Sequence, residues 1–266
     1  MSDISVIIPT YNRAETIVRA IESALRQTYP ILEILVCDDG STDNTENIIK
    51  LLQNPKIQFV NCGRNGLPAV PRNRGIKLAL GKWLAFLDSD DEWLPNKIES
   101  QLEAMKNDNT LASSTNAIRI INNQPAGNYF LSHLQPITFS TLLNSNQNIC
   151  SSVVIAKSLL ENISGFPEEL NHKGIEDYAF WLRISIYTDF SYLQDPFLYY
   201  FDAPDHSIRK NSSSFQSQHQ IIIKGLHDWV NQSNIKLSQK KIKLLNEALK
   251  KQQVKNTWLS FFKSKI

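Results

Sequence analysis

Three runs of polar residues in the first third of the chain could do chemistry, and the clearest is Asp88-Ser89-Asp90-Asp91. Carboxylates two residues apart, such as Asp88 and Asp90, can bind one hard divalent cation through their oxygen atoms. Mg²⁺ or Mn²⁺ held there could bridge the two phosphates of a diphosphate. An acidic surface turn or a helix cap before Trp93 is the alternative, and it suffices to explain an isolated Asp-x-Asp.

The other two runs could bind a nucleoside. In Pro9-Thr10-Tyr11-Asn12-Arg13, the Tyr11 ring offers a flat surface on which a base can stack. In Asp38-Asp39-Gly40-Ser41, one carboxylate could accept hydrogen bonds from a base or a ribose while its neighbour fixes the loop. Asp-Gly is also a common turn dipeptide. Taken singly, Tyr11 and Asp39 are better explained by structural roles.

The surrounding pattern predicts the elements that carry these runs. Apolar segments alternate with helical periodicity over the first ~90 residues, which is typical of an α/β domain with a mainly parallel sheet. Ligands bind at the carboxyl ends of strands in such sheets, so we expect the three runs to converge on one crevice. The predicted strands are Ile4–Ile8, Glu33–Cys37, Ile57–Val60 and Trp83–Leu87, with helices near 17–25, 48–52 and 68–80.

Beyond residue 110 the pattern changes. Asn-rich loops are predicted around 121–128, a strand at Ile149–Ala156 and a helix at Gly174–Tyr187. A polar stretch, Asn211–Gln220, leads into helical periodicity that continues to the end of the chain.

The composition excludes several classes of protein. The 266 residues are 42% hydrophobic, enough for a substantial core, and the net charge of +2 indicates no nucleic-acid partner. Cys37, Cys62 and Cys150 contain no Cys-x-x-Cys pair, which argues against a disulfide framework and a zinc site. The sequence shows no signal peptide and no run of ~18 apolar residues, so we expect a cytoplasmic protein that does not cross a membrane.

Several short motifs belong together by their order and spacing. They are Ser5–Arg13 (SVIIPTYNR), Gln27-Thr28-Tyr29, Glu33–Asp43 (EILVCDDGSTD), Arg72–Ile76 (RNRGI) and Phe86–Asp91 (FLDSDD). A looser series follows, with Gly165-Phe166, Glu176-Asp177, Trp181-Leu182-Arg183 and Ser207-Ile208-Arg209. Together these motifs resemble the family 2 glycosyltransferases of GT-A fold. The resemblance implies one GT-A domain at 1–210, with a donor half at 1–110 and an acceptor half at 111–210.

The resemblance also implies roles for the matched residues at the donor site. Pro9, Tyr11 and Asp39 would contact the nucleoside, in a pocket lined by Arg13. Asp88 would lie at the ribose and the metal, and Asp90 would be the principal ligand of Mg²⁺ or Mn²⁺.

On the acceptor side, Asp177 would be the general base that deprotonates the acceptor hydroxyl. Glu176 is its rival, and the alternative for both acids is that they only favour the N-terminus of the following helix. His206 could be a late metal ligand, although a lone loop histidine usually has no such role.

The reaction implied is inverting transfer of one sugar from a nucleotide-diphospho-sugar to a hydroxyl of a saccharide or lipid-linked saccharide, in polysaccharide or glycolipid biosynthesis. UDP is the favoured carrier, with dTDP and GDP as alternatives. Processive relatives carry a Gln-x-x-Arg-Trp element and membrane helices, and neither is present in the sequence. The competing interpretations are a nucleotidyltransferase, disfavoured because no glycine-rich phosphate loop is found near the N-terminus, and a catalytically silent sugar-nucleotide binding or assembly module.

The last segment concentrates positive charge. Residues 235–266 contain nine lysines against one acid, Glu247, so they carry +8 and the rest of the chain −6. An apolar stripe and a later aromatic cluster accompany the lysines, which suits a helix lying on an anionic membrane surface. A helix packed on the catalytic domain with its lysines outward is the alternative. The stripe is Leu237, Leu244, Leu245, Ala248 and Leu249, and the cluster is Trp258, Leu259, Phe261 and Phe262.

Overall fold

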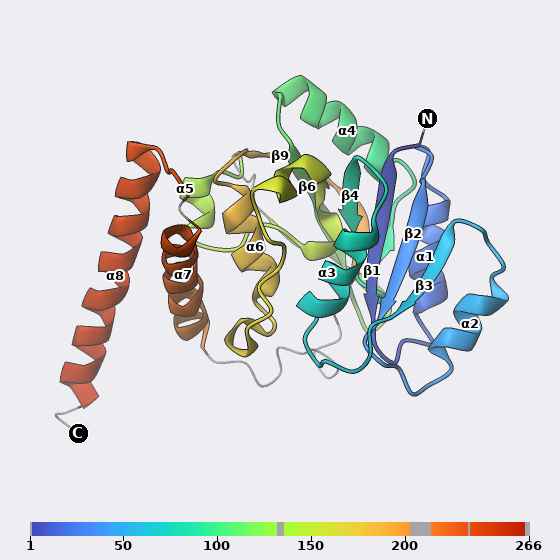
Figure 1. The fold of residues 1–266 in the computed structure, drawn as a ribbon, viewed down its shortest axis with the longest axis horizontal. Coiled ribbons are helices and arrows are strands. Elements are labelled where there is room, and N and C mark those ends of the chain that lie inside the picture. Colours follow the sequence, from blue (N-terminus) through green and yellow to red (C-terminus); the bar gives the residue numbers. More distant parts are fainter. Residues whose placement is uncertain (1, 132–135, 203–213, 234, 264–266) are drawn as a thin grey trace.

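The computed structural model describes residues 2–131, 136–202, 214–233 and 235–263 of the chain, and the side-chain surroundings as far as Gln252. One sheet runs through the molecule, with helices packed on both faces (Figure 1). Its strand order is β3-β2-β1-β4-β8-β6-β9-β5, and β7 pairs with β6. The expected α/β architecture with flanking helices is confirmed.

The first half of the sheet is parallel, as the alternation of strands and helices predicts. β1 lies between β2 and β4, and β3 forms the edge. β1 and β2 are buried along their whole length because helices cover both sides. The bounds are β1 Ile4–Thr10, α1 Ile17–Leu25, β2 Glu33–Asp38, α2 Thr45–Leu51, β3 Ile57–Asn61, α3 Ala69–Leu78 and β4 Trp83–Phe86.

The second half of the sheet is mixed, and it differs in places from the sequence pattern. β8 pairs antiparallel with both β4 and β6, whereas the long strand β9 runs parallel to β6. The bounds are β5 Glu92–Trp93, α4 Lys97–Asp108, β6 Ala112–Ile121, β7 Gln124–Asn128, α5 Phe139–Leu142, β8 Val154–Ala156, α6 Glu176–Ile184 and β9 Phe190–Phe201.

Two sequence predictions are corrected here. The segment 121–128 is a hairpin of β6 and β7 rather than a loop, because Asn122 and Asn123 both adopt left-handed backbone angles (φ 50° and 60°) and close a tight turn. The predicted strand Ile149–Ala156 is a 3₁₀ turn at Cys150–Ser152 followed by the short strand β8.

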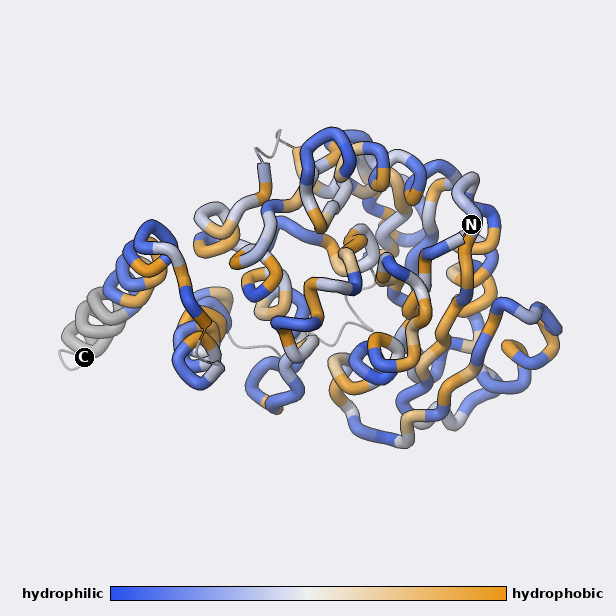
Figure 2. The backbone as a smooth tube through the Cα atoms, turned by 45° about the horizontal axis from the view of Figure 1, so that its top comes forward, coloured by the Kyte–Doolittle hydropathy of each residue, from blue (hydrophilic) through white to orange (hydrophobic). Residues whose placement is uncertain are grey.

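The core is divided between the two faces of the sheet. α1, α2 and α4 cover one face, and α3, α6 and α7 cover the other. Figure 2 shows hydrophobic residues concentrated on the sheet and alternating with hydrophilic residues along the helices. The sheet therefore forms a rigid support for the polar residues that follow its strands.

The C-terminal helices α7 (Phe215–Gln232) and α8 (Gln239–Lys263) lie side by side at the end of the molecule opposite β3 (Figure 1). α8 packs on α5 and α7: Leu245 is buried, and the other residues of the predicted apolar stripe pack against the same core. Lys241 Nζ donates to the carbonyls of Ser185 (3.0 Å) and Ile186 (2.7 Å), at the end of α6. The predicted domain boundary at 210 lies outside the described residues. Within the described chain, no helix is both long and apolar enough to span a membrane.

Candidate active site at the carboxyl ends of the strands

The three polar runs converge at one edge of the sheet. Thr10 ends β1 and is paired with Asp38 at the end of β2, while the acidic run follows β4 on the other side of β1. Ser41 and Asn12 are joined by a hydrogen bond of 2.8 Å, in which Asn12 N donates to Ser41 Oγ. Arg13 Nη2 lies 3.4 Å from Asp90 Oδ2. These contacts link the first run to the other two, as parallel strand ends require.

Asp38 and Asp39 have different roles, although they are adjacent. Asp38 Oδ2 accepts hydrogen bonds from the N–H groups of Gly40 and Ser41, at 3.0 and 2.8 Å, and so fixes its own turn. Asp39 instead turns toward the segment between β3 and α3 and accepts from the N–H groups of Asn65 and Gly66, both at 2.9 Å. Asp38 therefore closes its own loop, and Asp39 holds the segment that follows β3.

Arg64 completes this group. Its Nη1 donates to Asp39 Oδ2, and its Cζ lies 3.8 Å from the centroid of the Tyr11 ring. The sequence analysis did not single out Arg64 as a site residue. In the sequence, Arg64 is marked only by its position between Gly63 and Gly66. A basic residue between two glycines is too common to indicate a site residue.

The acidic run separates into two kinds of residue. Asp88 and Asp90 lie at the crevice, and Asp90 is partly exposed beside Arg13. Burial raises the pKa of Asp90 and the neighbouring Asp88 raises it further, while Arg13 opposes the shift. Asp91 is buried and accepts from Phe201 N (3.0 Å) and Ser151 Oγ, so it anchors β9 to the run.

The fit of a divalent cation can be judged from these carboxylates. Among the described residues, no three His, Cys, Asp or Glu side chains cluster closely enough to hold a metal without help. Asp88 and Asp90 nevertheless lie close enough to interact, because Asp88 adds to the rise in the pKa of Asp90 that burial causes. Mg²⁺ and related ions are held by one or two carboxylates together with phosphate oxygens and water, so two such ligands fit this mode of binding.

The acceptor-side acids lie at the start of α6, where they face different partners. Glu176 Oε1 accepts from Arg72 Nη1 and its Oε2 accepts from Gly174 N, both at 2.7 Å. Asp177 Oδ1 accepts from Tyr178 N at 2.8 Å, and its Oδ2 accepts from Asn146 Nδ2 at 3.3 Å. Both oxygens of Glu176 are thus committed to structure.

Arg72 joins the two halves of the site. This buried side chain donates from Nη2 to Asp88 Oδ1 at 2.7 Å while it holds Glu176 through Nη1. The sequence analysis recognised Arg72 only as part of a motif and assigned it no role, because nothing in the sequence pairs it with a residue so distant.

Cys150 is a buried residue that interacts electrostatically with the same groups. Burial raises the pKa of its thiol; Arg72 opposes that shift, and Asp88, Asp177 and Glu176 add to it. The thiol therefore lies within electrostatic reach of both the donor-side and the acceptor-side acids. His206 and the Ser207-Ile208-Arg209 motif lie outside the described residues.

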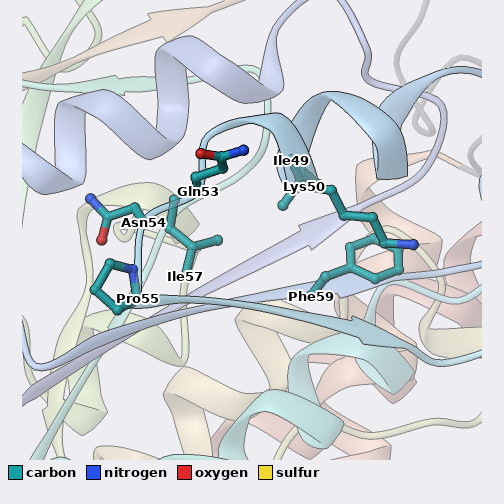
Figure 3. Close-up of a pocket in the computed structure, with 7 residues that line it drawn as sticks. All are labelled: Ile49, Lys50, Gln53, Asn54, Pro55, Ile57 and Phe59. Carbon is teal, nitrogen blue, oxygen red and sulfur yellow. The ribbon is translucent and has the colours of Figure 1, made fainter.

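A separate hollow lies between α2 and β3, away from the carboxylates (Figure 3). Ile49, Ile57 and Phe59 give it an apolar wall, and Lys50 is its one charged lining residue. No carboxylate lines this hollow, so the acidic residues at the strand ends are the stronger candidate for cation-assisted chemistry.

The chain is similar to known proteins over most of its length. The model of the family described as "Glycosyl transferase family 2" matches residues 5–158. The Escherichia coli enzyme UDP-Glc:alpha-D-GlcNAc-diphosphoundecaprenol beta-1,3-glucosyltransferase WfgD is 39% identical over 181 residues, which are 68% of this chain and 69% of WfgD.

Two solved structures share the fold. S. aureus TarS 1-349 in complex with UDP has a TM-score of 0.69 and 25% identity, and the match covers 94% of this chain and 71% of TarS. The mannosyltransferase PcManGT from Pyrobaculum calidifontis, in complex with GDP-Man and Mn²⁺, has a TM-score of 0.64 and 18% identity. That match covers 96% of this chain and 71% of PcManGT.

Proposed function

The chain belongs to glycosyl transferase family 2, and from that premise we propose that it transfers one sugar from a UDP-sugar to an acceptor hydroxyl with inversion at the anomeric carbon. The observation that carries the proposal is that one side chain, Arg72, joins the two sets of acids. It contacts Asp88, which follows β4, and Glu176, which begins α6 directly before Asp177.

The donor would lie along the strand ends. Its base would stack on Tyr11 beside Pro9 and Asp39, with Arg13 lining the pocket. Its diphosphate would lie near Asp88 and Asp90. These two residues would hold Mg²⁺ or Mn²⁺, which supplies positive charge to the departing diphosphate. The Mn²⁺ in PcManGT, which has the same fold, supports a divalent ion here.

Asp177 would act as the general base. A base in this position needs a carboxylate oxygen that can approach the acceptor hydroxyl. Arg72 and Gly174 N occupy both oxygens of Glu176, so Glu176 would have to give up a structural contact before it could act as the base. This requirement supports Asp177 over Glu176.

The acceptor would be a lipid-linked saccharide. WfgD, by its name, acts on GlcNAc-diphosphoundecaprenol with UDP-glucose. Its similarity spans the acceptor side of the site as well as the donor side, which supports an acceptor of the same class for this chain. Such a reaction belongs to polysaccharide or glycolipid biosynthesis.

Calorimetric titration with UDP, dTDP and GDP, with and without Mn²⁺, tests the donor site. We expect UDP to bind with metal dependence and Asp90→Ala to remove that dependence. Glu103→Ala, which removes an exposed carboxylate from α4, serves as the matched control. Binding that ignores both metal and Asp90 would contradict the donor assignment.

Product analysis tests the reaction itself. With the nucleotide that binds and a lipid-linked acceptor, we expect one sugar to be added in β linkage from an α-linked donor, seen by the anomeric coupling in NMR. A retained α linkage would contradict inversion. Donor binding with no turnover on any acceptor would instead indicate a silent binding module.

A further inference from the structure

We propose that the Arg64 side chain occupies the nucleobase subsite of the donor pocket, and that the base of the nucleotide sugar must displace it to bind. This inference rests on the proposed function, which assigns Tyr11 and Asp39 to the base. It adds a residue that competes with the donor for its own site.

Arg64 makes both of the contacts that a base would make. Its guanidinium lies over the Tyr11 ring, with Cζ 3.8 Å from the ring centroid. The same guanidinium donates from Nη1 to Asp39 Oδ2. A base that stacks on this ring and donates an N–H to this carboxylate needs the space that Arg64 fills. The two groups therefore exclude each other.

The backbone around Arg64 is fixed. The N–H groups of Asn65 and Gly66 each donate to Asp39 at 2.9 Å. The loop also lies close to Gly40, where an added Cβ would be only 2.9 Å from Arg64 N. A displacement of the whole loop would break these contacts, so the loop itself is expected to stay in place when the donor binds.

The side chain, in contrast, has a way out. Half of it is exposed to solvent (50%), whereas the Asp39 side chain is almost fully buried (7%). When Arg64 rotates into water, it loses its cation–π contact with Tyr11 and its ion pair with Asp39. Each of these interactions is weak where the cation is half exposed. Asp39 keeps its two backbone donors and gains the base in place of the guanidinium. The exchange therefore requires only a change of rotamer.

The test compares two ligands in the presence of Mn²⁺: UDP, which carries a base, and ribose 5-diphosphate, which lacks one. Calorimetry on the wild type and on Arg64→Ala gives the ratio of the two affinities. Both ligands carry a diphosphate, so the loss of one nearby positive charge weakens both affinities alike and does not change their ratio. Lys50→Ala, which removes an exposed cation from the same half of the chain, is the control variant.

We expect Arg64→Ala to increase the ratio of UDP affinity to ribose 5-diphosphate affinity by about three- to ten-fold, which corresponds to the loss of two weak contacts. Arg64→Lys should give a smaller increase, and Lys50→Ala none. An unchanged or lower ratio in Arg64→Ala would overturn the proposal, because Arg64 would then be indifferent to the base or would hold it. If UDP, dTDP and GDP all failed to bind the wild type, the proposed function itself would fall.

Discussion

Arg72 and Glu176 lie 104 residues apart in the sequence, yet Arg72 Nη1 donates to Glu176 Oε1 at 2.7 Å and both side chains are buried. The other end of the same guanidinium holds Asp88. One cation therefore neutralises an acid from each side of the crevice and fixes the distance between them. Asp88 and Glu176 are therefore positioned by the same side chain. We call Arg72 a positioning residue for this reason.

Arg72→Met should destabilise the protein strongly. The change leaves the buried Glu176 and the partly exposed Asp88 without their partner, and breaking a buried ion pair such as Arg72–Glu176 costs about 3–5 kcal/mol. Urea unfolding measures the loss. Arg119→Met is the control, because Arg119 pairs with Asp202 while 44% exposed, and a pair of that kind contributes about 1 kcal/mol or less. Equal losses in the two variants would contradict the positioning role.

Asp177→Asn should reduce turnover and leave the fold intact. Removal of a general base lowers the rate by about 10²–10⁴-fold, while the donor KM should stay near the wild-type value because Asp177 is on the acceptor side. Steady-state kinetics with the donor identified by calorimetry provides the measurement. Glu176→Gln, which disturbs a structural bond, should mainly lower stability. A larger loss of kcat in Glu176→Gln at normal stability would transfer the role of base to Glu176.

Much of the fold could be predicted because its first half follows simple rules. β1, β2 and β4 are continuous apolar runs, and parallel strands place their carboxyl ends at one edge. The approach of Asp39 to Thr10 and of Arg13 to Asp90 therefore followed from topology.

The second half could not be predicted in the same way, because its strands carry buried polar residues. Ser113, Ser114, Thr115 and Asn116 are buried within β6, yet they resemble a loop in the sequence. The sequence also did not indicate the partners of the two arginines. Arg64 contacts Asp39, 25 residues away, and Arg72 contacts Glu176, 104 residues away. Contacts at such separations depend on tertiary packing alone.

Stability should fall in mild acid because of His172, which packs against α7. Burial lowers the pKa of this imidazole and Arg183 lowers it further, while Glu169 and Glu176 oppose the shift. A lowered pKa means that the unfolded chain takes up the proton first, so stability is lost as the pH falls below the ordinary value of 6.5. Urea unfolding at pH 7.5 and 5.5 measures this, and His172→Gln should reduce the difference. A pH dependence identical in the variant would exclude His172 as its source.

Gly225→Ala should destabilise the docking of α7, although alanine usually favours a helix over glycine by about 1 kcal/mol. An added Cβ at position 225 would lie 2.9 Å from His172 Nε2 and 3.3 Å from its Cε1, and the buried ring has little room to withdraw. We expect a loss of about 1–3 kcal/mol in urea unfolding. In a His172→Ala background the same change should become neutral or stabilising, and an undiminished loss there would show that the clash is not with His172.

The lysines of α8 lead to the last prediction, which concerns membranes. The apolar stripe of this helix packs on the protein, so residues 235–249 do not offer it to lipid as the sequence had suggested. Among the described residues from 235 to 252, five lysines are nevertheless exposed, and an anionic surface attracts each by about 1 kcal/mol. They are Lys236, Lys240, Lys243, Lys250 and Lys251.

If α8 binds anionic lipid through these charges, replacing all five lysines by glutamine should lower co-sedimentation with phosphatidylglycerol vesicles at least ten-fold. Neither protein should pellet with neutral vesicles, because the attraction is electrostatic and the stripe is covered. A matched variant removes five exposed lysines from elsewhere on the molecule and should pellet like the wild type; these are Lys50, Lys56, Lys77, Lys82 and Lys106. Equal losses in the two variants would mean that net charge alone drives binding. No loss in either would leave α8 as a helix that only packs on the catalytic half.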